Sequence, residues 1–108
     1  MKIIYERVRV TTLQEFVEKH NLSILVTERE KPSRPEYRFY ARIPDSEVVR
    51  GTMLSGVFGG GATEEAAIRD YVPHISGQKL KIDTTYIDVP VLLPYVADEA
   101  VGVAGDKA

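Results

Sequence analysis

The fold is decided by Val57-Phe58-Gly59-Gly60-Gly61-Ala62-Thr63-Glu64-Glu65-Ala66-Ala67, in which an apolar, strand-like stretch runs into three glycines and then into a helix start. Thr63 is a residue type that caps helix N-termini, and Glu64 and Glu65 stand in the first turn, where the helix dipole favours negative charge. The stretch therefore predicts a strand over Thr52–Phe58, a glycine connector, and a helix that begins after Thr63.

The glycine connector resembles a phosphate-binding loop, because free amide groups at a helix N-terminus attract anions. A Walker loop has Lys followed by Ser or Thr at the helix start, where this chain has Thr63-Glu64-Glu65, and the two acids would repel a phosphate. We therefore interpret Gly59–Thr63 as an architectural connector and expect no cofactor. An enzyme that uses this turn as an anion cradle is the alternative.

The helix after the connector has one apolar face, made of Ala67, Ile68, Tyr71, Val72 and Ile75. Pro73 lies within this pattern, where a proline removes one hydrogen bond and clashes with the preceding turn at a cost of about 3 kcal/mol. We therefore expect a kink or an early end at Pro73, and Ser76-Gly77 to stop the element.

A capping box, Thr12-Leu13-Gln14-Glu15, predicts an earlier and shorter helix. Its apolar face consists of Leu13, Phe16 and Val17. Asn21 is suited to the left-handed residue that follows a helix end. Residues 1–10 alternate only in part and predict a short edge strand or an ordered arm.

Two strands are expected next, Leu22–Arg29 and Tyr37–Ile43, separated by a loop that contains two prolines. Alternate residues of a strand point to opposite faces of the sheet. The predicted core face of the second strand consists of Tyr37, Phe39, Ala41 and Ile43. The opposite face carries the residues that we predict to bind a partner, Arg38, Tyr40 and Arg42.

Short strands are also expected at Lys79–Asp83 and Tyr86–Val89, and the apolar segment Val89–Tyr95 is either a closing strand or an exposed binding segment. This order indicates an α+β fold: a three-stranded antiparallel meander (αβββα) with helices on one face plus one or two short C-terminal strands. Residues 1–96 are predicted to form a single α+β domain, and residues 97–108 a flexible C-terminal tail.

The composition is that of an ordinary soluble globular protein, with 108 residues, 44% hydrophobic residues and a formal net charge of −2. The first fifty residues carry +2 and the remainder −4, which permits a local basic patch. The sequence has no cysteine, no signal-peptide core and no apolar run approaching the roughly 20 residues of a membrane span. These features indicate a cytoplasmic protein.

Arg38, Tyr40 and Arg42 form a basic and aromatic stripe that allows three interpretations. Tyrosine and arginine are enriched in protein–protein interfaces, so the stripe predicts a partner protein or a second copy in a homodimer. The same residue types neutralise phosphates and stack on bases, so a nucleic acid is the second interpretation. The third is a solvated face whose aliphatic stems cover apolar neighbours.

Catalytic and metal chemistry find little support in the sequence. The two histidines, His20 and His74, lack paired ligand spacing, and neither has an identifiable acid to orient it. The carboxylate pairs Glu64/Glu65 and Asp83/Asp88 are explained by a helix start and a hairpin. We therefore expect no metal and no enzyme activity.

Two segments, Phe39-Tyr40-Ala41-Arg42-Ile43-Pro44-Asp45 and Gly61-Ala62-Thr63-Glu64-Glu65-Ala66, together resemble the HicB-type antitoxin fold. That family has a strand that ends in Pro-Asp, a glycine turn, and Thr-x-Glu-Ala at the start of a helix. The resemblance implies an αβββα unit and, as an alternative function, an antitoxin-like or nucleic-acid-binding regulatory module.

Residues 13–90 are similar to small proteins of tailed-phage genomes. The segments that carry this resemblance are Leu13-Gln14-Glu15-Phe16 with His20-Asn21-Leu22, Arg38-Phe39-Tyr40-Ala41, Phe58-Gly59 to Tyr71, and Ile75-Ser76-Gly77-Gln78-Lys79-Leu80 followed by Asp88-Val89-Pro90. This resemblance implies phage or prophage origin and no site residues. Small acidic phage proteins often bind and block a host protein, including defence complexes. We therefore expect a non-enzymatic, phage-encoded binding protein that modulates or inhibits a host protein.

Overall fold

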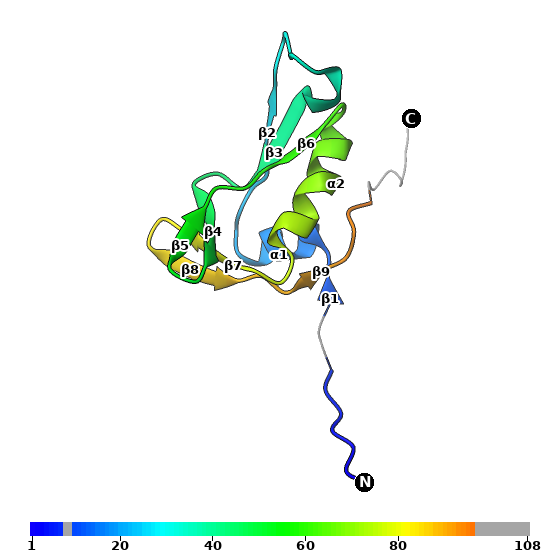
Figure 1. The fold of residues 1–108 in the computed structure, drawn as a ribbon, viewed down its shortest axis with the longest axis vertical. Coiled ribbons are helices and arrows are strands. Elements are labelled where there is room, and N and C mark those ends of the chain that lie inside the picture. The colour runs from blue at the N-terminus through cyan, green and yellow to red at the C-terminus, as the bar shows by residue number, and fades with distance from the viewer. Residues whose placement is uncertain (8–9, 97–108) are drawn as a thin grey trace.

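The computed structural model describes residues 1–7 and 10–96 (Figure 1). Within these residues, two α-helices pack with short strands that form three separate sheets, which confirms the predicted α+β class. The elements in chain order are β1 (Val10–Thr11), α1 (Leu13–Lys19), β2 (Leu25–Glu28), the 3₁₀ turn η1 (Pro35–Tyr37), β3 (Phe39–Arg42), β4 (Ser46–Arg50), β5 (Met53–Ser55), β6 (Gly59–Gly61), α2 (Glu64–Ile75), β7 (Lys79–Ile82), β8 (Thr85–Asp88) and β9 (Val91–Leu92).

The first sheet is antiparallel with the strand order β2-β3-β6, and α2 covers one of its faces (Figure 1). Because side chains alternate along each strand, successive cross-strand rows point to opposite faces. The rows that face α2 are Val26–Ala41–Gly59 and Glu28–Phe39–Gly61. The row between them, Thr27–Tyr40–Gly60, faces away from α2.

Gly59 and Gly61 allow the backbone of α2 to lie directly on β6. A Cβ atom on Gly59 would lie 2.2 Å from the carbonyl oxygen of Ala67 and 2.4 Å from the amide nitrogen of Tyr71. A Cβ atom on Gly61 would lie 2.6 Å from the Cβ atom of Ala66. Such distances are too short for any side chain, so the close approach of α2 requires glycine at both positions.

The prediction of a glycine connector after a strand at Thr52–Phe58 is therefore wrong. The three glycines are themselves strand β6, and within Thr52–Phe58 only Met53–Ser55 forms a strand. The physical reason is that β5 belongs to the second sheet. The chain must cross to the first sheet before the glycines pair with β3.

The second sheet is antiparallel with the strand order β5-β4-β7-β8. The hairpin of β4 and β5 turns at Gly51 and that of β7 and β8 turns at Asp83, with positive φ angles of 62° and 54°. The first of these hairpins stands in the chain between β3 and β6. The structure therefore does not confirm the αβββα meander, because the strands of the first sheet are not consecutive in the chain.

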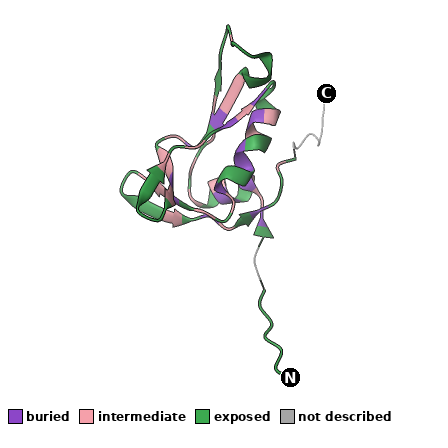
Figure 2. Cartoon of the chain, viewed as in Figure 1, coloured by how far each residue is buried: buried purple, intermediate pink, exposed green. Residues whose placement is uncertain are grey.

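The hydrophobic core joins both helices to both antiparallel sheets, and its buried residues follow the inner side of α2 (Figure 2). Its members are Leu13, Phe16, Ala41, Ile43, Val48, Ala67, Tyr71, Val72, Ile75, Leu80, Val89 and Leu92. Tyr71 is fully buried, and its hydroxyl oxygen accepts a hydrogen bond of 3.1 Å from the backbone N–H of Ile43. This bond ties α2 to the end of β3.

Both predicted helix starts are confirmed. The Thr12 hydroxyl accepts a hydrogen bond of 3.1 Å from the N–H of Glu15, whose carboxylate returns to the Thr12 N–H and completes the capping box. The Thr63 hydroxyl accepts a hydrogen bond of 3.0 Å from the N–H of Ala66. Asn21, with a φ of 55°, follows the end of α1 in the predicted left-handed conformation.

Of the two outcomes expected at Pro73, an early helix end is wrong, because α2 continues to Ile75. A proline lacks the N–H that would bond to the preceding turn and its ring crowds that turn, but it does not prevent the next residues from being helical; at Pro73 these are His74 and Ile75. The predicted stop at Ser76-Gly77 is confirmed: Ser76 is the C-cap and Gly77 has a φ of 72°.

The third sheet joins β1 to β9 by parallel pairing, Val10 with Val91 and Thr11 with Leu92. Val89 and Leu92 are buried, which confirms that the segment Val89–Tyr95 includes a closing strand. The predicted C-terminal tail, residues 97–108, lies outside the described residues.

Candidate functional site

The face of the first sheet that points away from α2 carries a cluster of aromatic and arginine side chains. At its centre is Tyr40, which pairs with Thr27 on one side and with Gly60 on the other. Because Gly60 has no side chain, the ring of Tyr37 lies over it: a Cβ atom on Gly60 would be 3.0 Å from Cδ1 of Tyr37. The small neighbours of Tyr40 therefore let aromatic rings gather on this face.

Two further contacts fix the ring of Tyr40. The guanidinium carbon of Arg29 lies 5.0 Å from its centroid, and the ring of Phe58 meets it edge to face at 5.2 Å with an interplanar angle of 74°. Contacts of these kinds contribute about 0.5–1.5 kcal/mol each. We name this cluster the aromatic–arginine surface, and its members are Arg29, Tyr37, Tyr40, Arg42 and Phe58.

The aromatic–arginine surface leaves large apolar groups open to solvent, since Tyr37 is 43% and Phe58 is 53% exposed. Two hollows adjoin its centre. One of about 230 Å³ is lined by Thr27, Arg29, Tyr40, Arg42 and Phe58, and one of about 440 Å³ by Tyr37, Tyr40, Phe58, Gly60, Asp70 and His74. Tyr40 and Phe58 line both hollows, so a partner could place one side chain on each side of this pair.

Charge is distributed unevenly around the surface. Across residues 1–7 and 10–96, no carboxylate lies within 4.0 Å of the guanidinium groups of Arg29 or Arg42. On the rim next to α2, the Asp70 carboxylate accepts a hydrogen bond of 2.9 Å from the Gly60 N–H and lies 3.8 Å from Nε2 of His74. Positive charge therefore lies on the β2–β3 side and a carboxylate on the α2 side.

The prediction that Arg38 shares a face with Tyr40 and Arg42 is wrong. Arg38 follows η1 in a helical conformation, with φ −69° and ψ −32°, so the strand alternation begins only at Phe39. Its Nε donates a hydrogen bond of 2.7 Å to Oε2 of Glu28, and its guanidinium lies 5.8 Å from the centroid of the Phe39 ring. Glu28 and Phe39 belong to a row that faces α2, which places Arg38 on that side of the sheet.

Tyr37 is also misplaced by the strand prediction, which put its side chain in the core. Pro35 opens the 3₁₀ turn η1, and Tyr37 is the last residue of that turn. The turn rotates its ring onto the outer face beside Tyr40, where it stays partly exposed. Tyr37 therefore joins the candidate site.

Arg29 and Phe58 are members of the site that the sequence did not reveal. The strand ladder continues one residue past β2, where the N–H of Arg29 donates to the carbonyl oxygen of Arg38 at 2.8 Å. Alternation from Thr27 assigns Arg29 to the outer face. A sequence prediction that included the pairing of β2 with β3 would therefore have placed Arg29 in the site. No local signal marks Phe58, because it reaches Tyr40 only through the pairing of β6 with β3.

The histidines are not brought together. His20 is the C-cap of α1 and its ring lies 4.9 Å from that of Phe16, whereas His74 lies near the end of α2. Wherever the structure places residues, no three His, Asp or Glu side chains are grouped to hold a metal ion.

Two backbone N–H groups that an anion cradle at Gly59–Thr63 would use have partners within the chain. The Gly60 N–H donates to Asp70, and the Ala66 N–H donates to the Thr63 hydroxyl. Both donors are therefore engaged within the chain, and a carboxylate stands where a phosphate would have to approach.

Neither of the two described helices is long and apolar enough to cross a membrane. No protein-family model, no curated protein and no solved structure matches the chain.

Proposed function

We propose that the chain is a non-enzymatic binding protein whose partner is another protein, held at the aromatic–arginine surface. The observation that carries the proposal is the pair of exposed rings, Tyr37 and Phe58, around the half-buried Tyr40, beside two arginines with no carboxylate partner in the described part of the chain. Aromatic residues and arginine are enriched in protein interfaces, and tyrosine and arginine are among the residues that contribute most of the binding energy.

The packing around Tyr40 favours a protein partner over a nucleic acid. A base stacks on an aromatic face that is free, whereas Arg29 already lies over the ring of Tyr40 and Phe58 contacts it edge to face. Asp70 on one rim would also repel a phosphate. A protein partner needs only apolar side chains for the two hollows and carboxylates that pair with Arg29 and Arg42.

The resemblance to small tailed-phage proteins extends the proposal to the identity of the partner. We propose that the chain is phage-encoded, acts in the cytoplasm of the host cell, and modulates or inhibits a host protein, a host-defence complex being the first to test. A sheet face suits this role because its contact residues are ordered before binding, so little conformational entropy is lost on association.

Truncation of the aromatic centre tests this proposal. We expect Tyr40→Ala and Phe58→Ala each to weaken binding by about tenfold or more, because interface aromatics commonly contribute over 1 kcal/mol. The partner is first captured from host lysate and identified by mass spectrometry. Isothermal titration calorimetry with the purified partner then gives the Kd of each variant.

Two control variants separate this surface from the rest of the chain. Met53→Ala truncates an apolar side chain that is 67% exposed on β5, and Arg38→Ala removes a guanidinium from the other side of the first sheet. We expect both to bind within about twofold of the parent, since neither lies in the contact. Parent-like binding by folded Tyr40→Ala and Phe58→Ala would place the contact elsewhere.

One observation favours a second candidate, an antitoxin-like or nucleic-acid-binding module. The guanidinium groups of Arg29 and Arg42 lie beside exposed rings and have no carboxylate partner among residues 1–7 and 10–96. Phosphate contacts release counterions, so affinity for single-stranded DNA or RNA should then fall steeply between about 50 and 200 mM salt. Fluorescence anisotropy measures this slope. A flat response removes the candidate, and a slope that Arg29→Ala and Arg42→Ala each reduce supports it.

A further inference from the structure

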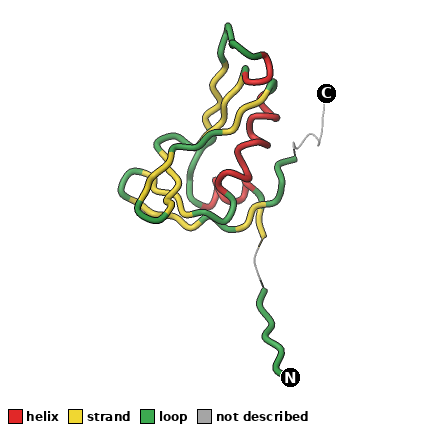
Figure 3. The backbone as a smooth tube through the Cα atoms, viewed as in Figure 1, coloured by secondary structure: helices red, strands yellow, loops and turns green. Residues whose placement is uncertain are grey.

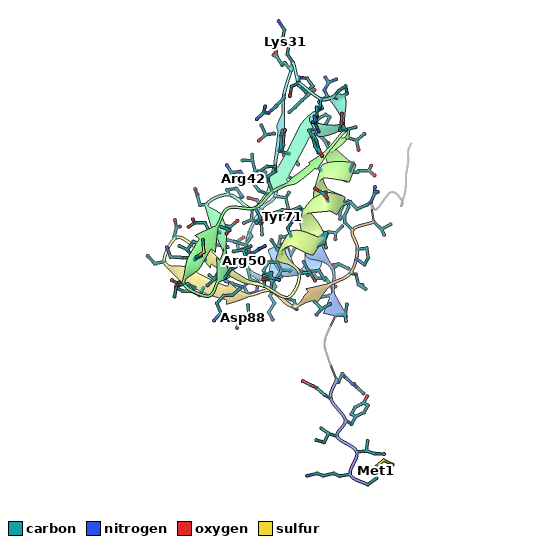
Figure 4. All side chains as sticks on the ribbon, in the orientation of Figure 1. Met1, Lys31, Arg42, Arg50, Tyr71 and Asp88 are labelled. Carbon is teal, nitrogen blue, oxygen red and sulfur yellow. The ribbon has the colours of Figure 1, made fainter. Side chains whose placement is uncertain are left out.

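Residues 1–7, which we name the arm, form an extended segment that leaves the folded body (Figure 3), with Met1 at its far end (Figure 4). Its three consecutive apolar residues are almost fully solvated: Ile3 is 79%, Ile4 83% and Tyr5 79% exposed. Isoleucine and tyrosine are strong strand formers, and their consecutive exposure is costly in water. The arm therefore presents a strand sequence that none of the described residues covers.

Among the residues that the structure describes, no strand pairs with the outer edge of β8 on the second sheet. The sheet ends at β8, and the Val89 N–H donates to the Gln78 carbonyl oxygen at 2.8 Å, so residues 85 and 87 direct their backbone groups toward β7. The N–H and C=O groups of Tyr86 and Asp88 consequently point outward. This edge offers two donor–acceptor pairs to an added strand.

The side chains of the arm and of β8 are complementary in polarity. In an extended arm, Ile3 and Tyr5 lie on one face and Ile4 on the other. On β8, Ile87 packs against the core side of the sheet, and Tyr86, 57% exposed, lies on the outer side. A strand added at this edge would therefore place apolar side chains beside both residues.

Charge is complementary as well. The arm carries Lys2 and Arg7 against the single acid Glu6. In the β7–β8 hairpin, Lys79 and Lys81 lie on the inner strand β7, whereas Asp83 lies in the turn and Asp88 at the end of the edge strand β8. The side chain of Asp88 is 87% exposed, and its ion pair among the described residues is a long contact of 3.9 Å to Lys79. Opposite charges thus face each other when the arm lies along β8.

We propose that the arm of one copy adds as a strand to the β8 edge of a second copy, and that reciprocal exchange makes the protein a homodimer. Strand addition of this kind derives its affinity from main-chain hydrogen bonds and its specificity from alternate side chains. The arm and the β8 edge belong to the same sequence, so each of two copies can donate its arm to the other. Such an exchange has twofold symmetry and uses both arms and both edges, so it ends at a dimer. The inference is independent of the partner proposed for the aromatic–arginine surface, which lies on the other antiparallel sheet.

The other edges of the two antiparallel sheets, formed by β6, β5 and β2, suit the arm less well. On β6 the N–H of Gly60 already donates to the Asp70 carboxylate. β5 has three residues, and of these only Leu54 turns its backbone groups outward. On β2 the outward backbone groups belong to Val26 and Glu28, and the Glu28 side chain is already paired with Arg38. Of these four edges, β8 alone combines two outward backbone pairs with an acidic side chain, Asp88, whose ion pair within the described residues is long.

Light scattering coupled to size-exclusion chromatography tests the proposal with the full chain. We expect the mass of a dimer, twice the 12.1 kDa of the chain, and the mass of a monomer for a variant lacking residues 2–7. Ile4→Pro should also give a monomer, because proline removes a backbone donor at an exposed position and leaves the body folded. A monomeric parent protein, or a dimer that survives both changes, overturns the proposal.

Cross-linking identifies the strand edge to which the arm binds. It also distinguishes an arm that binds a second copy from an arm that folds back onto its own chain. The chain has no cysteine, so Tyr5→Cys and Tyr86→Cys introduce single reactive sites. When the two single variants are mixed, a short bismaleimide should join them, whereas Tyr5→Cys mixed with Leu25→Cys, at the β2 edge, should remain unjoined. In a variant that carries both Tyr5→Cys and Tyr86→Cys, the cross-link should join two chains. A cross-link within one chain of this double variant, or equal yields of cross-linking at the β8 and β2 edges, overturns the proposal.

Discussion

Gly59→Ala is expected to lower the free energy of unfolding by about 3 kcal/mol or more. The added Cβ atom would overlap the carbonyl oxygen of Ala67 and the amide nitrogen of Tyr71, at 2.2 and 2.4 Å. Both are backbone atoms of α2, so no change of rotamer relieves the overlap and the helix must lift from β6. A loss of this size lowers the Tm by about 10–25 °C, which thermal unfolding followed by circular dichroism measures.

Two other glycines serve as controls for this substitution. A Cβ atom on Gly56 would meet no atom within 4 Å, so Gly56→Ala should change stability by less than about 0.5 kcal/mol. Gly60→Ala should give an intermediate loss, because its Cβ atom would meet only the ring of Tyr37, which can move. Equal Tm values for Gly59→Ala and Gly56→Ala would mean that α2 does not pack backbone to backbone on β6.

Tyr71→Ala is expected to cost about 3–5 kcal/mol, because it removes the largest fully buried side chain and leaves a cavity between α2 and the sheets. Tyr71→Phe isolates the contribution of the hydroxyl group. It keeps the ring but leaves the buried N–H of Ile43 without its acceptor, for which we expect a loss of about 1–3 kcal/mol. Urea unfolding at equilibrium measures both losses.

The matched control for the hydroxyl group is Tyr37→Phe. Tyr37 lies on the exposed face of the first sheet, where water can replace any bond that its hydroxyl makes, so the substitution should change stability by less than about 0.5 kcal/mol. If Tyr71→Phe were as stable as Tyr37→Phe, the Ile43 N–H would have found another acceptor, and the bond between α2 and β3 would not contribute to stability.

Features of this fold that depend on neighbouring residues were predictable from the sequence. Thr12 and Thr63 start helices because their hydroxyl groups meet an N–H three residues later, and Asn21 ends one because it tolerates a positive φ. The strands predicted at Lys79–Asp83 and Tyr86–Val89 lie at Lys79–Ile82 and Thr85–Asp88, within one residue at each end, because a short turn separates two strand-forming runs. In each case the interactions that decide the structure lie within a few residues.

Features that depend on distant partners were not predictable in this way. The glycines at 59–61 have a turn-like composition, yet they form a strand because α2 leaves no room for side chains there. Likewise, β4 pairs with β7 across the whole of α2, which separates the β4–β5 hairpin from the first sheet. Local propensity carries no information on either pairing.

The residues of the candidate site show the same difference between local and distant determinants. Alternation within one strand correctly put Tyr40 and Arg42 on a common face. It failed for Arg38 because the 3₁₀ turn ends only one residue earlier and rotates that side chain toward Glu28. Arg29 and Phe58 join the surface through cross-strand pairing, which becomes visible only when the register of β2, β3 and β6 is known.

The parallel pairing of β1 with β9 has a consequence for the kinetics of folding. It joins Val10 to Val91, and the Leu93 N–H adds a hydrogen bond of 2.8 Å to the carbonyl oxygen of Thr11, so almost the entire described chain lies within the closed loop. The entropy lost on closure rises with loop length, and non-local contacts of this kind slow folding. The two hairpins and the helices can form beforehand, whereas this closure must wait until the C-terminal segment has been synthesised.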